Sequence, residues 1–332
     1  MDNRAKSFFP CLLMSIIMLA LPMTSLPMSN DNQMKYGDIS TSSAKSQTTW
    51  SGVVELTGSY TINISDELVI APCTLVKLPN TARIFVEGRL SIEGDLTCPV
   101  IIDQDGSGLH YGIQFNQSSF GRGSIIDNLS IDNAMYGVTI YGSNPVLNNI
   151  TINNPSRVGI DLFSGANPII SDLIVDQSGR GFTYSDWRYG IGLSVGAGSS
   201  PIVERATLTD LRIRGLNIWG DSGGIYRQLT IDNVTAEGAS AISAGVWVED
   251  SRPLITNVSV DKSDYGILIR HIDDGGNTRA VVRDCLVTNS MYRGIYVDKA
   301  NHTNFTNYET ADFTNTVVSG TGGPNAKTSG IG

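Results

Sequence analysis

The chain has 332 residues, of which 41% are hydrophobic and 17% are charged, and its formal net charge at pH 7 is −9. This is enough apolar material for one long core. The acidic balance argues against nucleic acid as a partner, because nucleic-acid binding needs basic stripes.

The N-terminus has the pattern of an export signal. Arg4 and Lys6 are followed by a nearly continuous apolar run over residues 8–21, and then by small residues. We therefore expect residues 1–29 to be a signal peptide and the protein to be secreted or located at the cell surface. An uncleaved membrane anchor is the alternative, although prolines interrupt the apolar run. Residues 30–49 are polar and are expected to be a flexible leader.

A phrase of the form Gly-apolar-x-apolar then recurs along the chain, with gaps of 21 to 31 residues. Its alternation is typical of a strand with one buried face. A repeat of this period predicts a solenoid or an array. The phrases begin at Gly112, Gly137, Gly159, Gly190, Gly215, Gly245, Gly266 and Gly294.

Each glycine phrase is followed by two more apolar segments. One often comes directly after a proline, as in Pro145-Val146-Leu147, and the other usually opens with Asn or Asp, as in Asn149-Ile150-Thr151-Ile152. Three short strands in such a coil leave no room for helices, and a propeller blade needs about 40 residues. A parallel β-helix fits best, with its strands stacked from coil to coil.

Across residues 53–319 the sequence resembles the right-handed parallel β-helix superfamily, the pectate-lyase-like solenoids. We expect an all-β, single-stranded, right-handed parallel β-helix (solenoid) of about 8–10 coils over residues 50–320, with its hand taken from the resemblance. The side chains expected to point inward are Val138, Ile140, Ile160, Leu162, Ile191, Leu193, Val246, Val248, Ile267 and Ile269. Residues 321–332 form a glycine-rich tail, and we expect either that residues 299–316 cover the last coil or that the chain is a piece of a longer surface protein.

The cysteines leave two alternatives open. Cys73 and Cys98 are separated by 25 residues, about one coil, so they form either a disulfide or a stack of two buried thiols. Cys285 is expected to be unpaired. The Cys and His spacing does not suggest a metal site, and no cofactor is expected.

The outward side chains of the glycine phrases give the candidate binding surface. Because side chains alternate across a strand, five aromatic rings are predicted on one sheet that faces solvent. We add Trp187 from the loop at residues 177–188, because loops on a rigid scaffold often carry function. The expected carbohydrate-binding residues are Tyr141, Phe163, Trp187, Trp219, Trp247 and Tyr296. The alternative is that loops cover these rings and that they belong to a satellite core.

Three functions follow from this sequence. The first is a secreted or surface protein that binds a polysaccharide or surface glycan, with a membrane involved only through an uncleaved N-terminus or an anchor in a longer chain. The second is a polysaccharide lyase or glycoside hydrolase, whose catalytic residues the sequence does not identify because it contains no motif of the polygalacturonases or pectate lyases. The third is a structural surface spacer or adhesin module.

Overall fold

The computed structural model describes residues 46–180, 189–236, 242–271, 279–299 and 311–321, to which the statements below refer. The predicted signal peptide, Trp187 and nearly all of the glycine-rich tail lie outside these residues. Strand β1 (Ser46–Trp50) begins within the segment predicted to be a leader. No helix within the described ranges is long and apolar enough to cross a membrane.

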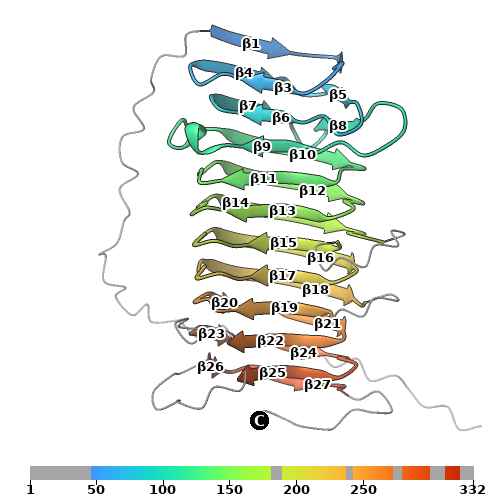
Figure 1. Cartoon of the computed structure of the whole chain (residues 1–332). Coiled ribbons are helices and arrows are strands. Elements are labelled where there is room, and N and C mark those ends of the chain that lie inside the picture. The colour runs from blue at the N-terminus through green and yellow to red at the C-terminus, as the bar shows by residue number, and fades with distance from the viewer. Residues whose placement is uncertain (1–45, 181–188, 237–241, 272–278, 300–310, 322–332) are drawn as a thin grey trace, which may run out of the picture. The chain divides into compact units, whose positions relative to one another are not determined.

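The described chain winds through two parallel sheets, and its coils stack one on the next (Figure 1). Sheet B contains ten strands, each paired with its counterpart in the neighbouring coil. They are β3 (Tyr60–Ile62), β6 (Ile84–Val86), β9 (Ile113–Phe115), β11 (Tyr136–Tyr141), β13 (Val158–Phe163), β15 (Ile191–Val195), β17 (Arg214–Ile218), β19 (Ala244–Glu249), β22 (Tyr265–His271) and β25 (Arg293–Lys299).

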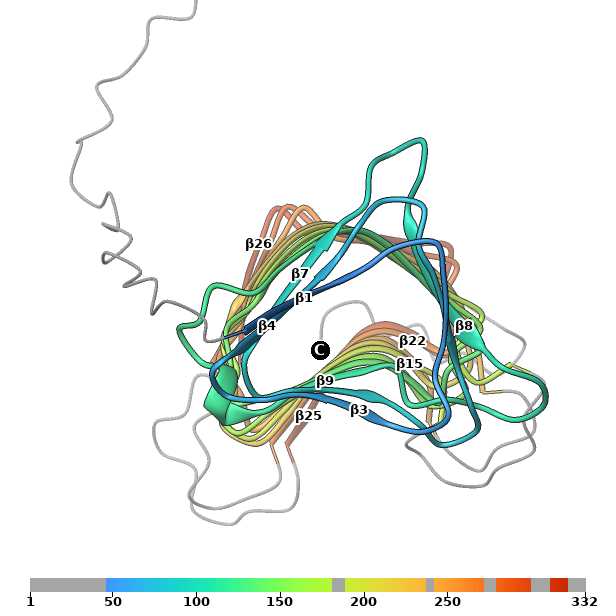
Figure 2. The ribbon, with the colours of Figure 1, turned by 90° about the horizontal axis from the view of Figure 1, so that it is seen from above.

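Sheet A contains seventeen strands and forms the remaining walls of the coil (Figure 2). Besides β1 it consists of β2 (Val53–Glu55), β4 (Asp66–Ile70), β5 (Leu75–Leu78), β7 (Arg89–Glu93), β8 (Val100–Gln104), β10 (Ile125–Asp132), β12 (Val146–Asn153), β14 (Ile169–Asp176), β16 (Ile202–Leu211), β18 (Ile225–Val234), β20 (Leu254–Thr256), β21 (Ser259–Ser263), β23 (Ala280–Arg283), β24 (Leu286–Thr288), β26 (Ala311–Thr314) and β27 (Val317–Ser319). The helical content of the described part is one short 3₁₀ turn, η1 (Gln117–Ser119).

The central coils differ from the expected three short strands. In β10, β12, β14, β16 and β18 the second and third apolar segments join into one strand of eight to ten residues. Each of these strands bends at a residue with positive φ, such as Asn149 at 52° and Asp172 at 55°. Asn and Asp tolerate this left-handed conformation better than most residues, which explains why they open the predicted turn phrase.

The glycine of the repeated phrase is required by close packing between coils. A Cβ at Gly159 would lie 2.6 Å from the backbone oxygen of Gly192 and 2.7 Å from the side chain of Val175. The strand pairing also corrects one predicted register: Ile160 pairs with Leu193, and Asp161 pairs with Ser194. The fourth phrase therefore begins at Gly192 instead of Gly190, because Gly190 belongs to the turn before the strand and has φ of 96°.

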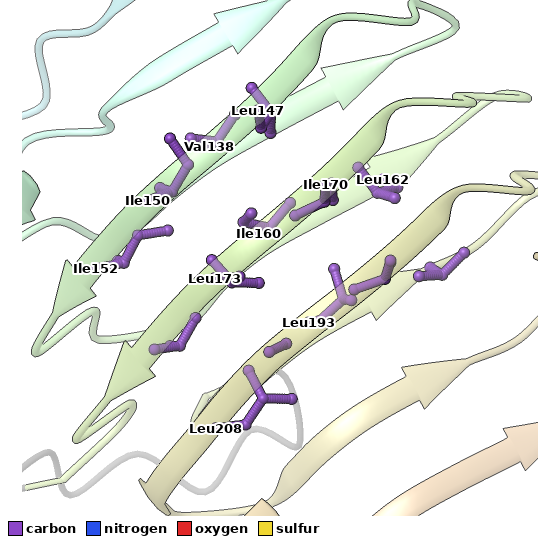
Figure 3. Packing of buried hydrophobic residues seen from close by; sticks show 14 of the residues in the cluster. Val138, Leu147, Ile150, Ile152, Ile160, Leu162, Ile170, Leu173, Leu193 and Leu208 are labelled. Atoms are coloured by element: carbon purple, nitrogen blue, oxygen red, sulfur yellow. The ribbon is translucent and has the colours of Figure 1, made fainter. Parts of the chain in front are cut away.

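The inward side chains form one continuous apolar core between the sheets (Figure 3). Nine of the ten side chains predicted to point inward belong to this core, and Ile160, Leu162 and Leu193 are completely inaccessible to solvent. The prediction is wrong for Ile191, which is buried but pairs with Val158 and lies on the outer side of sheet B, because the fourth phrase begins at Gly192. Cys73 and Cys98 form a disulfide in the first coils, and Cys285 is free and buried. The parallel β-helix expected from the sequence is confirmed.

Candidate functional site

A hollow of about 630 Å³ lies on the outer face of sheet B, over strands β11, β13 and β15. Thirteen side chains line it, and they come from consecutive coils, so the hollow extends along the solenoid axis. The lining residues are Arg83, Tyr111, Met135, Tyr136, Thr139, Tyr141, Arg157, Val158, Asp161, Phe163, Ile191, Ser194 and Trp219.

The floor of the hollow is a column of polar residues. Thr139 pairs with Asp161, and Asp161 pairs with Ser194, so these three side chains leave the sheet one above the next. All three are buried. A few buried polar groups among aromatic and apolar side chains are typical of sites in which polar groups orient a ligand.

Asp161 carries the strongest electrostatic perturbation in the hollow. Burial raises the pKa of its carboxyl to about 7, and a hydrogen bond from the Ser194 hydroxyl opposes this shift only in part. Its Oδ1 atom has no hydrogen-bond partner within the described residues. Buried carboxyl groups are normally satisfied, and a strongly shifted pKa in a cleft is a recognised mark of a functional site.

One wall of the hollow consists of three aromatic rings. Tyr141 and Phe163 pair across neighbouring strands and stack with ring centroids 5.3 Å apart at 17°. Trp219 continues the wall, with its ring 6.2 Å from Phe163 and nearly perpendicular to it. Tyr141 is 37% exposed, and the other two rings are half-buried. The flat faces of this aromatic wall are therefore accessible from the hollow.

The opposite wall consists of arginine and tyrosine side chains. The guanidinium of Arg83 lies 4.4 Å from the ring centroid of Tyr111, and the rings of Tyr111 and Tyr136 are 6.1 Å apart. Arg157 donates hydrogen bonds to the hydroxyls of Tyr136 (2.8 Å) and Tyr189 (2.7 Å). We call these five residues the arginine–tyrosine wall; Tyr189 holds Arg157 but does not itself line the hollow. Although burial acts to lower the pKa of Arg157, the hydrogen bonds from its guanidinium to the two tyrosines raise it above its usual value.

Three of the six predicted binding residues meet in this hollow, namely Tyr141, Phe163 and Trp219. Trp247 and Tyr296 instead belong to a separate apolar cluster further along sheet B. Trp247 is only 4% exposed, which differs from the expectation that it faces solvent.

Trp247 points outward from the sheet, but other side chains cover it. The guanidinium of Arg214 lies 3.9 Å from its ring centroid, and its Nε1 donates to Oε2 of Glu249 at 3.2 Å. Strand alternation predicts the direction of a side chain but not what lies on top of it. The covering role of Arg214 therefore could not be inferred from the pattern.

The arginine–tyrosine wall was not predicted, although the sequence contains a signal for part of it. Tyr111, Tyr136 and Tyr189 each come directly before a glycine, and Tyr265-Gly266 repeats this dipeptide. A recurring residue at one place in a solenoid coil forms a column in space. Arg83 and Arg157 have no comparable sequence pattern, and only the structure brings them to these tyrosines.

A second hollow, of about 550 Å³, lies on the outer face of sheet A. Its floor carries Ser130, Thr151 and Thr207, and the loop with Asp95 and Leu96 forms one edge. Its lining contains no aromatic ring. The hollow on sheet B therefore remains the stronger candidate.

Metal binding has no visible basis in the described part of the chain. No group of three or more His, Cys, Asp or Glu side chains there is placed to hold an ion. The chemistry available in the hollow on sheet B is that of one carboxyl group, two guanidinium groups, hydroxyl groups and aromatic faces.

Comparison with known proteins agrees with this architecture. Residues 100–252 match the family described as a right handed beta helix region. The chain is a right-handed parallel β-helix. A comparison with curated protein sequences found no match.

Two solved structures align with this β-helix at low sequence identity. An alginate lyase from Paenibacillus sp. str. FPU-7 aligns with a TM-score of 0.56 and 12% identity, over 82% of this chain and 96% of the lyase. The catalytic domain of a GH87 alpha-1,3-glucanase in complex with nigerose aligns with a TM-score of 0.35 and 16% identity, over 83% of this chain and 59% of that one. The first of these likenesses supports the fold of the β-helix and leaves its function to be argued from the site.

Proposed function

We propose that this β-helix binds a polysaccharide in the hollow on sheet B, with the sugar chain running along the solenoid axis. The observation that carries the proposal is a polar floor, Thr139–Asp161–Ser194, between two walls that both present aromatic rings. Sugar rings have apolar faces that pack on aromatic rings, while their hydroxyls need hydrogen-bond partners. The hollow offers both kinds of contact along one line.

The spacing of the coils supports this direction of the ligand. Neighbouring strands lie about 4.8 Å apart, which is close to the length of one sugar residue in an extended chain. Tyr141 and Phe163 come from neighbouring coils, and Trp219 comes from two coils further on. Successive sugar residues could therefore meet successive rings and successive floor groups.

Binding can be tested by titrating oligosaccharides of several classes into the protein in a calorimeter. Replacing Trp219 by Ala should weaken binding by roughly 2- to 10-fold, since one aromatic contact contributes about 0.5–1.5 kcal/mol. Replacing Phe120, which is 58% exposed and lies outside the hollow, by Ala should leave the affinity unchanged. If no glycan binds, or if both variants behave alike, the structural-spacer function takes the place of this proposal.

A second candidate function is cleavage of the bound glycan, and the state of Asp161 favours it. A carboxyl group with a pKa near 7 can both donate and accept a proton at neutral pH, as a general acid or base must. The carboxyl also belongs to the floor of the hollow, beside the proposed path of the glycan. Lyase and hydrolase chemistry both require proton transfer at the glycosidic bond.

Cleavage would be detected as new reducing ends after incubation with the glycan that binds best. Asp161→Asn should abolish the activity while retaining binding, because Asn keeps the shape and the acceptor for Ser194 but cannot transfer the proton. Equal activity of this variant and the wild type would remove Asp161 from the reaction. Binding without any product would leave the first candidate function alone.

We also propose that the protein acts outside the cytoplasm, on the basis of the N-terminal charge and apolar pattern. Mass spectrometry of the protein from its native host should give a mature N-terminus after the apolar run. An intact N-terminus on cytoplasmic protein would contradict this.

A further inference from the structure

Two arginines in the hollow lack the carboxylate partners that several other arginines of the solenoid have. Arg89 pairs with Glu67, Arg205 with Asp172, and Arg252 with Asp221. Within the described ranges, neither Arg83 nor Arg157 forms an ion pair.

The groups that hold these two arginines are neutral. Arg83 donates to the amide oxygen of Gln114 and stacks on Tyr111 and Phe85. Arg157 lies against the rings of Tyr136 and Tyr189, with its guanidinium 4.4 Å from the Tyr189 centroid, and donates to both hydroxyls. Rings and amides fix the direction of a guanidinium, but they do not cancel its charge.

Donor capacity also remains on Arg157. Each of its two terminal nitrogens donates to one tyrosine hydroxyl and therefore keeps a second N–H, whereas the Nε atom is buried. A guanidinium presents five N–H donors in a planar fork that matches the oxygens of an anion. The arginine–tyrosine wall therefore holds a rigid, incompletely used anion-binding group at the edge of the hollow.

The charge of the hollow has the opposite sign to that of the chain. Among its lining residues only Arg83, Arg157 and Asp161 have ionisable groups that are charged near neutral pH, so the hollow is cationic. The chain as a whole has a net charge of −9. A cationic cleft on an anionic protein attracts anions locally, because cleft walls of low polarity concentrate the field.

We propose that the hollow selects glycans that carry anionic groups and that Arg83 and Arg157 bind those groups. This inference rests on the proposed glycan-binding function. Two kinds of glycan carry a suitable anionic oxygen group: those with the carboxylate of a uronic acid and those with a sulfate ester. The aromatic wall contacts the sugar faces, and the arginine–tyrosine wall contacts the charged edge.

The positions of the two arginines add a length requirement. Arg83 directly precedes β6 and Arg157 directly precedes β13, and these strands are separated by three steps of the sheet order β6–β9–β11–β13. Three steps correspond to roughly 14 Å along the axis, about the length of three sugar residues. We therefore expect affinity to rise most strongly once an oligosaccharide is long enough to reach both guanidinium groups.

The experiment compares matched ligands by calorimetry on the full chain. The probes are oligouronates of two to eight residues, the same oligosaccharides with their carboxyl groups reduced to alcohols, and a sulfated oligosaccharide with a neutral backbone. We expect the charged probes to bind roughly 10- to 100-fold more tightly than the reduced probe, as hydrogen bonds to charged groups contribute that much. Added salt should weaken only the charged probes.

Variants locate the effect. Arg157→Gln and Arg83→Gln should each remove most of the ratio between the affinities for the charged and the reduced probe, and Arg157→Lys should keep part of this ratio. Arg252→Gln, at an exposed arginine outside the hollow, is the matched control and should change nothing.

The outcomes separate the inference from the function on which it rests. Equal binding of charged and reduced probes by the wild-type protein overturns the charge selection and leaves glycan binding intact. A failure of every probe to bind overturns both. A preference for the uronate over the sulfated probe, or the reverse, supports the inference and identifies the source of the anion. Because the wild-type comparison is decisive alone, a variant that fails to fold does not prevent the test.

Discussion

Trp219 lies across Gly196, and only a glycine leaves space for it. A Cβ at Gly196 would be 2.3 Å from Cε2 of the Trp219 indole and 2.4 Å from Cζ2. Gly196 follows β15 directly, and Trp219 follows β17, the next strand of sheet B. The missing side chain on one coil thus sets the position of the ring on the next.

The Gly196→Ala variant tests this relationship. Gly196 does not have the positive φ that would strain an alanine, so the substitution acts mainly by displacing Trp219. We expect glycan affinity to fall by roughly 2- to 10-fold, the contribution of one aromatic contact, with little loss of thermal stability. Calorimetric titration measures the affinity. Gly58→Ala, at a site with no neighbouring atom within 4 Å, is the control and should behave as the wild type.

Asp161 should lower the stability of the protein at neutral and alkaline pH. Its pKa is about 7 in the folded protein and 3.8 as the unperturbed value, so the two states have the same protonation below pH 3.8. As the pH rises from 3.8 to 7, the unfolded state loses this proton first and folding becomes less favourable. The full effect, on the order of 4 kcal/mol, is reached above pH 7.

Asp161→Asn should therefore be more stable than the wild type at pH 8 and equally stable at pH 4. Unfolding in denaturant at a series of pH values gives the difference directly. A constant difference across this range would show that the Asp161 carboxyl is not perturbed as described, and it would weaken the case for a functional role.

His110 should act on stability in the opposite direction. The ring is fully buried, its Nδ1 accepts the Gly112 N–H at 3.0 Å, and its Nε2 donates to the carbonyl oxygen of Asp132 at 2.9 Å. Burial lowers the pKa of His110, although the Asp132 carbonyl and nearby carboxylates oppose this shift. The neutral ring is the form that fits, so its contribution is complete above pH 6.5 and is lost as the pH falls through the folded pKa.

The two titrations overlap, so the His110 effect is best measured in the Asp161→Asn background. There the free energy of unfolding should decrease as the pH falls below 6.5. Adding His110→Gln should lower stability at pH 8 and remove this particular decrease. If the decrease persists unchanged, another group is responsible for it.

The disulfide should stabilise the first coils. Cys73 and Cys98 are 25 residues apart in the sequence and are bonded, and closing a loop of that length is worth about 3 kcal/mol by the chain-entropy estimate. The double variant with serine at both positions should therefore melt at a lower temperature and become insensitive to reducing agent. An unchanged melting temperature would contradict this, and Cys285→Ser serves as the thiol control.

The sequence predicts the fold well because the same sequence pattern recurs in nearly every coil. The glycine has no room for a Cβ, the residues on either side alternate, and Asn or Asp occupies the left-handed bend, so three independent constraints repeat together. The register slip at Gly190 has a local cause. Glycine occurs at both position 190 and position 192, and only the pairing of Ile160 with Leu193 shows which of the two corresponds to Gly159.

The binding site is predicted less completely, for physical reasons. Alternation gives the outward direction of Tyr141, Phe163 and Trp219, and these three meet in the hollow. Whether an outward ring is open depends on long side chains from neighbouring coils. Arg214 covers Trp247, whereas Tyr141 is 37% exposed among the described residues, and no periodicity in the sequence determines which arginine lies over which ring.

The most direct test of glycan binding in the hollow on sheet B is a crystal structure of the protein with an acidic oligosaccharide of six residues. We predict sugar density parallel to the solenoid axis, between the aromatic wall of Tyr141, Phe163 and Trp219 and the arginine–tyrosine wall, with a sugar hydroxyl near Asp161 and the anionic groups near Arg83 and Arg157. Sugar bound in the second hollow on sheet A, or an empty sheet B hollow at a ligand concentration that saturates the protein in solution, would contradict the proposal.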